Sequence, residues 1–315
     1  MKKNSTIFIV TLIALLLTSC KGTPSKKKKS SSYGGSETTA ITSDSGNQST
    51  NVNPTSANPS SGSSTSKPST TSLSPDVESY YDEIDDSLSG TDLLNALRDL
   101  NEKYKEREVG YSSMGTSASG AFKYTDYDPS SVRYDENGQP YGTLIVSFYS
   151  GNTMTSFNRE HVWPNTHGGS LVEHDIHMPR PTIPAENGSR GHSFYVEGMK
   201  SKKNEGWDPA MEDFGKEDYR GDSARIIFYC MIATKNLVLV DDQSRSSMTK
   251  NNEMGVISDM LSWNERYPVL EREQRRNAGA QYLQGNRNPF IDHPEYACKI
   301  WGATNDKTRA ACGLS

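Results

Sequence analysis

The hydrophobic and polar positions divide the chain into three stretches of different character. Residues 1–20 have a basic start and an apolar run from Ile7 to Leu17. Residues 21–75 consist mainly of Ser, Thr, Asn, Gly and Pro and show no apolar period. Residues 76–315 carry periodic apolar positions, which are typical of a folded domain. We therefore expect one globular domain of about 240 residues behind a disordered tether.

Several segments of the third stretch predict helices. A first helix is expected from Pro75 to Ile84, and a second follows it because one helical face carries Leu93, Ala96, Leu97, Leu100 and Tyr104. Asp222 is expected to cap a helix through the apolar segment 224–231, which should be buried on all sides. Further helices are expected near Ser258 and from Pro268 to Gly285.

Strand signals are fewer. The segment Thr143 to Tyr149 is rich in β-branched and aromatic residues and predicts a buried strand. Turn signals at Asp128-Pro129 and Asn137-Gly138 precede it. Few strands among several helices predict a helix-rich α+β domain.

The chemically richest stretch runs from Phe157 to His192 and holds five of the six histidines. It pairs an acid with a histidine at Glu160-His161 and closes with Asn187 and Arg190. Pro164 and Gly168-Gly169 are expected to end the strand that carries the acid and the histidine. Thr182 and Pro184 predict a helix start, so Asn187 and Arg190 should share one helical face.

These residue types suit a metal-assisted hydrolysis. Mg²⁺ is usually held by one or two protein oxygens and takes the rest of its shell from water and phosphate, and Glu160 and Asn187 offer such oxygens. An imidazole has an unperturbed pKa near ~6.5, so His161 can take a proton from water at neutral pH. Hydrolysis of a phosphodiester requires such a base and a cation for the developing charge.

Two other classes of function remain open from the residues alone. One is a zinc-dependent hydrolase that uses several clustered histidines, although positions 161, 167, 174 and 177 match no HExxH helix. The other is a noncatalytic surface-binding lipoprotein on a long Ser/Thr tether. We expect most of the lone histidines, His167, His174 and His293, to be structural, and His177 either to orient the site or to pack.

The distribution of charge limits where a nucleic-acid-binding surface can lie. The chain has a net charge of −5, and residues 1–75 carry eight lysines against Glu37 and Asp44, a balance of +6, so residues 76–315 carry −11. An acidic domain is not what nonspecific nucleic-acid binding predicts. A basic patch must therefore be local, and its candidates are Lys200, Lys202, Lys203, Arg272, Arg275, Arg276 and Arg287.

The segment Asn158 to Pro164, NREHVWP, resembles the signature of the bacterial endonuclease I family, which comprises extracellular and periplasmic nucleases of the His-Me finger (ββα-metal) superfamily. The resemblance runs from about Tyr80 to Tyr296. Its other segments, in the same order, are Asp175-Ile176-His177 with Arg180-Pro181, Asn187 with Arg190, residues 220–225 and residues 284–294.

The resemblance implies a ββα-metal core and an endonuclease that cleaves DNA, and often RNA, with little sequence preference. It implies that His161 is the general base, that Glu160 and Asn187 hold Mg²⁺, with Mn²⁺ or Ca²⁺ as substitutes, and that Arg190 neighbours the phosphate.

Further substrate contacts are expected from Arg180, Arg287 and His192. Two departures are visible: Met178 and Pro179 stand where the family commonly has His and Leu, and His192 stands where it commonly has Asn. His192 is therefore either a neutral replacement or an extra phosphate contact.

The N-terminus predicts export. Leu17-Thr18-Ser19-Cys20 resembles the lipobox of bacterial lipoproteins, which implies cleavage before Cys20 and lipidation of its thiol. The mature protein is then a membrane-anchored lipoprotein on the extracellular or periplasmic side. A plain secretory signal and an uncleaved anchor are the alternatives. We expect nucleic acid and the membrane as partners, no protein partner, and a monomer.

The remaining cysteines predict one disulfide. Cys230 lies in an apolar run and is expected to be a buried thiol. Cys298 and Cys312 lie fourteen residues apart near the C-terminus and can pair in an oxidising compartment. No CxxC motif is present, which argues against a thiolate zinc site.

Overall fold

The computed structural model describes residues 75–201 and 205–315. The expected signal peptide, the tether, Cys20, Lys202 and Lys203 lie outside these ranges. No helix within the described ranges is long and apolar enough to cross a membrane.

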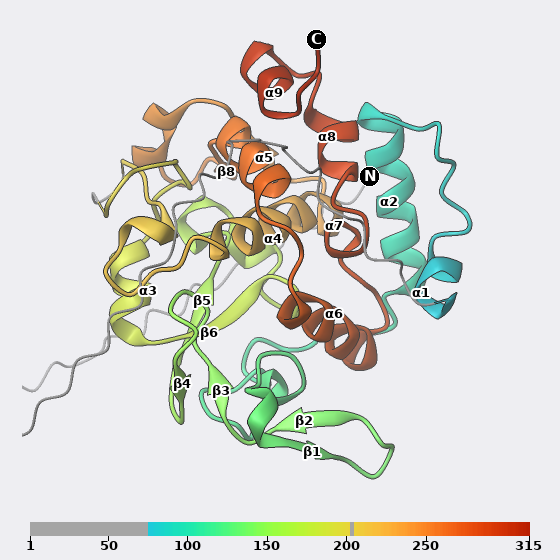
Figure 1. Ribbon diagram of the computed structural model, residues 1–315, viewed down its shortest axis with the longest axis vertical. Coiled ribbons are helices and arrows are strands. Elements are labelled where there is room, and N and C mark those ends of the chain that lie inside the picture. Colours follow the sequence, from blue (N-terminus) through green and yellow to red (C-terminus); the bar gives the residue numbers. More distant parts are fainter. Residues whose placement is uncertain (1–74, 202–204) are drawn as a thin grey trace, which may run out of the picture. The chain divides into compact units, whose positions relative to one another are not determined.

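The described chain combines helices with small sheets (Figure 1). The α-helices are α1 (Pro75–Tyr80), α2 (Gly90–Tyr104), α3 (Pro184–Arg190), α4 (Tyr219–Ala233), α5 (Ile257–Arg266), α6 (Glu271–Gln284), α7 (Pro289–Asp292), α8 (Tyr296–Trp301) and α9 (Asp306–Ala311). The strands are β1 (Val132–Tyr134), β2 (Pro140–Gly142), β3 (Ile145–Val146), β4 (Thr153–Met154), β5 (Asn158–His161), β6 (Pro179–Thr182), β7 (Val238–Leu239) and β8 (Glu253–Met254).

Consecutive strands pair within the described residues, antiparallel in β1–β2, β3–β4 and β5–β6 and parallel in β7–β8. The mixture of helices and small sheets confirms the expected helix-rich α+β fold class.

Helix α4 is the buried scaffold of the fold. Every residue from Tyr219 to Ile232 is buried, as the apolar sequence predicts, and the helix packs against α2, α5 and α7 (Figure 1). The helix begins at Tyr219, four residues before the start that a cap at Asp222 implies, so Asp222 lies inside the first turn and is not its cap. Its carboxylate instead accepts a hydrogen bond from Arg272 Nε at 3.0 Å.

The predicted helices around this scaffold are confirmed with shifted ends. Helix α2 buries Leu93, Leu97 and Leu100 on one face. Helix α1 ends at Tyr80 and not at Ile84. Helix α6 ends at Gln284 and is followed by its C-cap Gly285, whose φ of 98° lies in a region that favours glycine.

The strand expected over residues 143–149 is much shorter in the structure. Only Ile145 and Val146 pair with β4. The backbone N–H of Leu144 donates to Ser131 Oγ, and that of Phe148 donates to the carbonyl of Pro181 on β6. Residues 145–149 are buried or half-buried as expected, but Thr143 and Leu144 are exposed, so the prediction was wrong at the start of the segment. The backbone partners of the segment are divided among a side chain, two other strands and residues 126–128, so it forms no long ladder.

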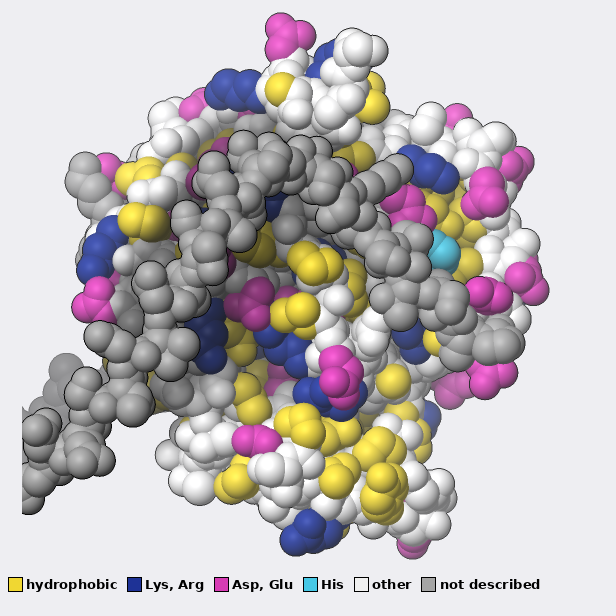
Figure 2. All heavy atoms as spheres, in the orientation of Figure 1, with side chains coloured by type: hydrophobic (Ala, Val, Ile, Leu, Met, Phe, Trp, Pro, Cys, Tyr) yellow, Lys and Arg dark blue, Asp and Glu magenta, His cyan; other side chains and the backbone are white. Residues whose placement is uncertain are grey.

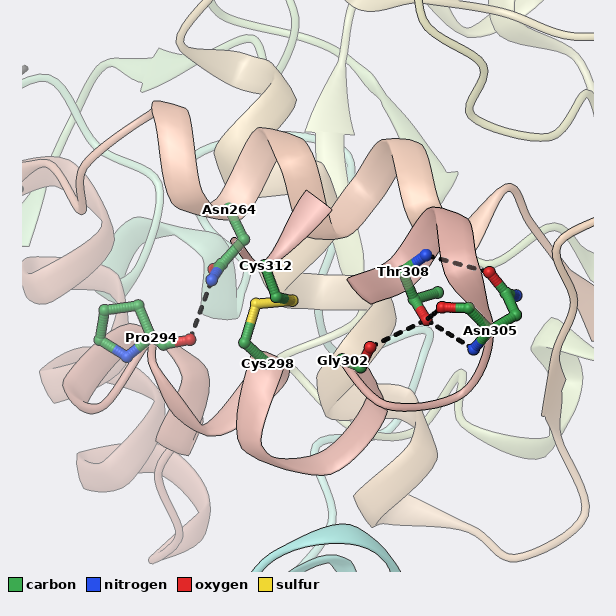
Figure 3. The surroundings of a disulfide bond; sticks show 7 residues. All are labelled: Asn264, Pro294, Cys298, Gly302, Asn305, Thr308 and Cys312. Atoms are coloured by element: carbon green, nitrogen blue, oxygen red, sulfur yellow. Dashed lines mark hydrogen bonds between the residues drawn. A yellow bond between two sulfur atoms is a disulfide. The ribbon is translucent and has the colours of Figure 1, made fainter. Parts of the chain in front are cut away.

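The C-terminal helices are joined by a disulfide. Cys298 of α8 and Cys312 at the end of α9 are bonded, and Figure 3 shows them beside the loop between these helices. Asn305 caps α9 through its side chain, which accepts from the backbone N–H of Thr308 at 3.0 Å. The expected pair is confirmed, and Cys230 is a buried free thiol.

Candidate active site

The acid and the histidine of the Glu160-His161 pair face opposite sides of the β5–β6 ribbon. Glu160 lies opposite Arg180 in the antiparallel register, and His161 lies opposite Pro179. Successive side chains on a strand alternate between faces, so each residue has its own surroundings. Strand β5 ends at His161, as the sequence predicts.

Glu160 lies in a buried polar pocket. Its Oε1 accepts a hydrogen bond from the hydroxyl of Tyr149 at 2.9 Å and lies 3.5 Å from Arg190 Nε. Burial raises the pKa of this carboxyl to about 7, while Arg190 and Tyr149 act in the opposite direction. Both contacts involve Oε1, so Oε2 receives no hydrogen bond from the described residues.

Helix α3 carries the amide side chain of Asn187. Pro184 is its first residue, and Glu186 accepts a hydrogen bond from Ser147 Oγ at 2.6 Å, which ties the helix start to the core. The helix packs against β5, and Arg190 reaches Glu160 from its last turn. Asn187 lies three residues earlier, on the same helical face. Its half-buried side chain makes no hydrogen bond to another described residue.

His161 is held between an acid and a phenol. Its Nε2 lies 3.1 Å from Glu173 Oε2, and its Nδ1 lies 3.4 Å from the hydroxyl of Tyr111. Burial lowers the pKa of the imidazole, and Glu173 only partly offsets this effect. Because 15% of the side chain is exposed, a neutral imidazole at this position remains accessible to water.

The loop after β5 explains how Glu173 reaches the histidine. Gly168 has a φ of 94°, and an added Cβ at Gly169 would lie only 2.0 Å from the carbonyl oxygen of Trp163. Glycine at these two positions therefore permits a tight reversal of the chain. The short helical turn Gly169–Leu171 follows and places Glu173 beside His161.

Comparison with known proteins identifies the family of the chain. Residues 91–295 match the family described as endonuclease I. The chain belongs to the endonuclease I family. It is 32% identical to an extracellular ribonuclease of Bacillus amyloliquefaciens over 249 residues, which cover 72% of this chain and 80% of the relative.

A second extracellular ribonuclease is similar to a shorter part of the chain. An extracellular ribonuclease of Bacillus subtilis (strain 168) is 34% identical over 168 residues, which cover 48% of this chain and 56% of that relative. Family membership makes the chain a nuclease that acts on a nucleic-acid substrate.

Arg190 of this endonuclease I family member is fully buried. Its Nη2 donates to the carbonyl of Val162 at 2.7 Å, and its Nη1 donates to the carbonyl of Gly191 at 3.1 Å. Its guanidinium lies beside the Glu160 carboxylate, with 3.5 Å between Nε and Oε1. This placement favours a role in positioning the carboxylate over the expected contact with the phosphate.

The three expected substrate contacts have different surroundings. Arg180 pairs with Asp126 at 2.8 Å and lines a cavity. Arg287 is buried and donates two hydrogen bonds of 2.7 Å to Asp292, so its placement favours a structural role over substrate contact. The ring of the half-buried His192 lies 6.0 Å from that of His167.

Where grey atoms do not cover the face drawn in Figure 2, Lys and Arg side chains of the described residues lie among acidic and hydrophobic ones. Arg276 is buried and pairs with Asp126, and Lys200 pairs with an exposed acid, Asp213. Arg272 and Arg275 line the same cavity as Arg180. Two of the candidate basic residues therefore lie near an expected substrate contact.

The histidines of this endonuclease I family member do not converge on one point. His167 contacts Asn251, His174 contacts the backbone of Tyr111, and His177 contacts the carbonyl of Asn286. In residues 75–201 and 205–315, no three His, Cys, Asp or Glu side chains are grouped so that they could hold a metal together. Oxygens of Glu160 and Asn187 offer a different donor set, which suits a hard cation that keeps most of its water.

Sequence reasoning missed three residues of the site, namely Tyr111, Tyr149 and Glu173. Tyr149 lies in the segment expected to be a strand, Glu173 lies between two histidines of the 157–192 stretch, and Tyr111 lies in no motif. Their contacts depend on chain reversals, so no residue spacing indicates them.

Proposed function

We propose that this nuclease is an endonuclease that hydrolyses phosphodiester bonds of RNA and DNA with little sequence preference and requires Mg²⁺. One observation carries the proposal. Two oxygen donors, Glu160 Oε2 and the Asn187 side chain, make no hydrogen bonds to described residues and belong to β5 and α3, which pack against each other. His161 follows Glu160 directly on β5. In this proposal, strands β5 and β6 together with helix α3 form the ββα-metal core.

His161 is the general base in this proposal. If Nε2 donates its proton to Glu173, the neutral ring presents Nδ1 as a proton acceptor. The lowered pKa keeps that nitrogen unprotonated at neutral pH. His161 then removes a proton from the attacking water, while the Glu173 carboxylate stabilises the imidazolium that forms.

Glu160 and Asn187 are the proposed ligands of Mg²⁺. The buried Glu160 carboxylate has only partial compensation from Arg190, at 3.5 Å, so a bound cation suits its charge. When bound, Mg²⁺ polarises the phosphate and stabilises charge on the leaving oxygen. Tyr149 and Arg190 hold the carboxylate in place.

RNA is included because two relatives are extracellular ribonucleases. DNA is included because the sequence motifs resemble nucleases that cleave both. The test is incubation of the purified protein with circular plasmid DNA and with a long RNA, with Mg²⁺ or with excess chelator. We expect internal cleavage of both with Mg²⁺ and none with chelator. Full activity in chelator would contradict the metal requirement, and tightly bound zinc would favour the zinc hydrolase.

We also propose that the protein is exported and anchored through lipid on Cys20. The two relatives are named as extracellular, and residues 1–20 have the layout of a lipoprotein signal. Replacement Cys20→Ala should move the nuclease from the membrane fraction and abolish labelling by a fatty-acid probe. Unchanged lipid labelling of Cys20→Ala would contradict the anchor.

A further inference from the structure

A cavity of about 260 Å³ lies beside Arg180. Three other cations line it, namely Lys216, Arg272 and Arg275. Its aromatic lining consists of Tyr127, Phe148 and Tyr219, and its acidic lining of Asp126 and Asp128. The proposed reaction uses none of these residues as base or metal ligand, so the cavity is a separate feature of the nuclease.

Each arginine of the cavity lies over an aromatic ring. The guanidinium carbon of Arg180 lies 4.1 Å from the ring centre of Phe148, and that of Arg272 lies 4.1 Å from the ring centre of Tyr219. Arg275 lies 5.9 Å from the ring centre of Tyr127. A ring beneath a guanidinium fixes the orientation of its plane, and the other face of that plane can stack on a nucleobase.

The cations of the cavity differ in how fully their charge is compensated. Arg272 is paired with two acids, Asp218 at 2.8 Å and Asp222 at 3.0 Å. Arg275 pairs only with the exposed Glu271, and such surface pairs contribute little. Lys216 is exposed and forms no ion pair with a described residue. Lys216 and Arg275 therefore have the most charge available for an anionic ligand.

The cavity adjoins the proposed catalytic site through two neighbouring strands. Arg180 lies directly opposite Glu160 in the β5–β6 register, and directly opposed residues point to the same face of a ribbon. Phe148 lines the cavity, and the next residue, Tyr149, donates to the Glu160 carboxylate. Arg180 of the cavity wall is thus the cross-strand neighbour of the proposed metal ligand.

We propose that this cavity binds one nucleotide of a single-stranded nucleic acid, adjacent to the phosphodiester that is cleaved. The assignment rests on the proposed nuclease function and names a substrate class for it. Lys216 and Arg275 contact the phosphate of this nucleotide, and the exposed face of an arginine plane stacks on its base. Arginine and lysine are the usual phosphate partners, and stacking needs no particular base.

The size of the cavity favours single strands. Its volume is slightly below the roughly 300–1,000 Å³ of pockets that enclose drug-sized ligands, so it suits one nucleotide fragment. A base reaches an arginine plane only after it has left its neighbours in the stack, and unpaired strands allow this at low cost. A paired base would first have to break its pair.

The test compares variants of the full chain on two substrates. One is a fluorescent single-stranded hexanucleotide, and the other is bis(p-nitrophenyl) phosphate, which has a phosphodiester but no nucleotide. For Lys216→Gln and Arg275→Gln we expect the ratio of the hexanucleotide kcat/KM to the small-diester kcat/KM to fall about tenfold, mainly through KM. Binding of the hexanucleotide in excess chelator, measured by fluorescence anisotropy, should weaken by a similar factor.

Two control variants each remove one positive charge outside the cavity. Arg266 lies 5.6 Å from the ring centre of Tyr267 and pairs with Glu197, so Arg266→Gln matches Arg275→Gln outside the cavity. Lys307 is exposed on α9, so Lys307→Gln matches Lys216→Gln. Both controls should leave the substrate ratio and the binding unchanged.

Three outcomes are decisive. If the cavity variants behave like their controls in both assays, the cavity does not bind substrate and the inference is wrong. If they lose as much binding to a duplex as to the single strand, the assignment to single strands is wrong. If the unmodified protein cleaves neither substrate, the proposed function fails instead, and the binding assay still tests the cavity.

Discussion

The carboxylate of Glu173 lies 3.1 Å from Nε2 of His161, although twelve residues separate the two in the sequence. This contact gives the histidine a defined orientation, and in the proposed mechanism it leaves Nδ1 as the proton acceptor. Glu173 makes no hydrogen bond to either proposed metal ligand, so in that mechanism it acts through His161.

Replacement of Glu173 should therefore affect turnover more than binding. We expect Glu173→Ala to lower kcat on single-stranded RNA about 10- to 100-fold and to leave KM nearly unchanged, because the imidazolium loses its partner. Glu173→Gln keeps an acceptor for Nε2 and should retain more activity. Steady-state kinetics of both variants check this. Equal activity of Glu173→Ala and the unmodified nuclease would show that the contact has no catalytic role.

Arg225 of α4 and Glu273 of α6 form a buried ion pair with two hydrogen bonds of 2.6 and 2.7 Å. Removing one partner leaves a buried charge without its counterion. We expect Arg225→Met to lower the free energy of unfolding by about 3–5 kcal/mol in chemical denaturation. The double variant Arg225→Met/Glu273→Leu should lose less than the sum of the two single variants. Strict additivity would mean that the pair does not couple these helices.

The buried imidazole of His177 leads us to expect that the free energy of unfolding falls in acid. Burial lowers the pKa of this imidazole to about 4, against opposing attraction from Asp175. The unfolded state then binds more protons than the folded state between pH 4 and about 6.5, so this contribution to stability falls as the pH falls through that window. Its size is on the order of 3 kcal/mol.

The check is thermal or chemical unfolding of His177→Gln and the unmodified protein at pH 7.5 and pH 4.5. The glutamine amide can still donate to the carbonyl of Asn286, which lies 3.2 Å from His177 Nε2. We expect the variant to lose less stability than the unmodified protein on acidification. His174→Gln, a change at a half-exposed histidine, is the control and should follow the unmodified protein.

Local features of the sequence predict much of the scaffold. Helix α4 follows from an apolar segment without a polar face, and the end of α6 follows from Gly285, where φ is positive. The pairing of Cys298 and Cys312 follows from an export signal and a short separation. These features depend on neighbours in the sequence, so periodicity and residue type are sufficient to find them.

Contacts between distant segments are not predictable in this way. The sequence predicts that Arg287 contacts substrate, because it is a candidate for a local basic patch, but the residue lies buried against Asp292. Tyr149 reaches Glu160 only because the short strand β3 gives way to a segment that bonds to β6. The sequence therefore indicates which groups perform the chemistry, while the structure adds the groups that orient them.

The central claim is that His161 is a base and not a metal ligand, and one variant tests it most directly. For His161→Ala we predict an unchanged fold and Mg²⁺ affinity, measured by circular dichroism and titration calorimetry, with turnover on RNA and plasmid DNA about 100- to 10,000-fold lower. Asn187→Ala is the contrasting variant, in which weakened metal dependence is partly recovered by more Mg²⁺. Cleavage by His161→Ala at the unmodified rate, or loss of its bound metal, would contradict the account.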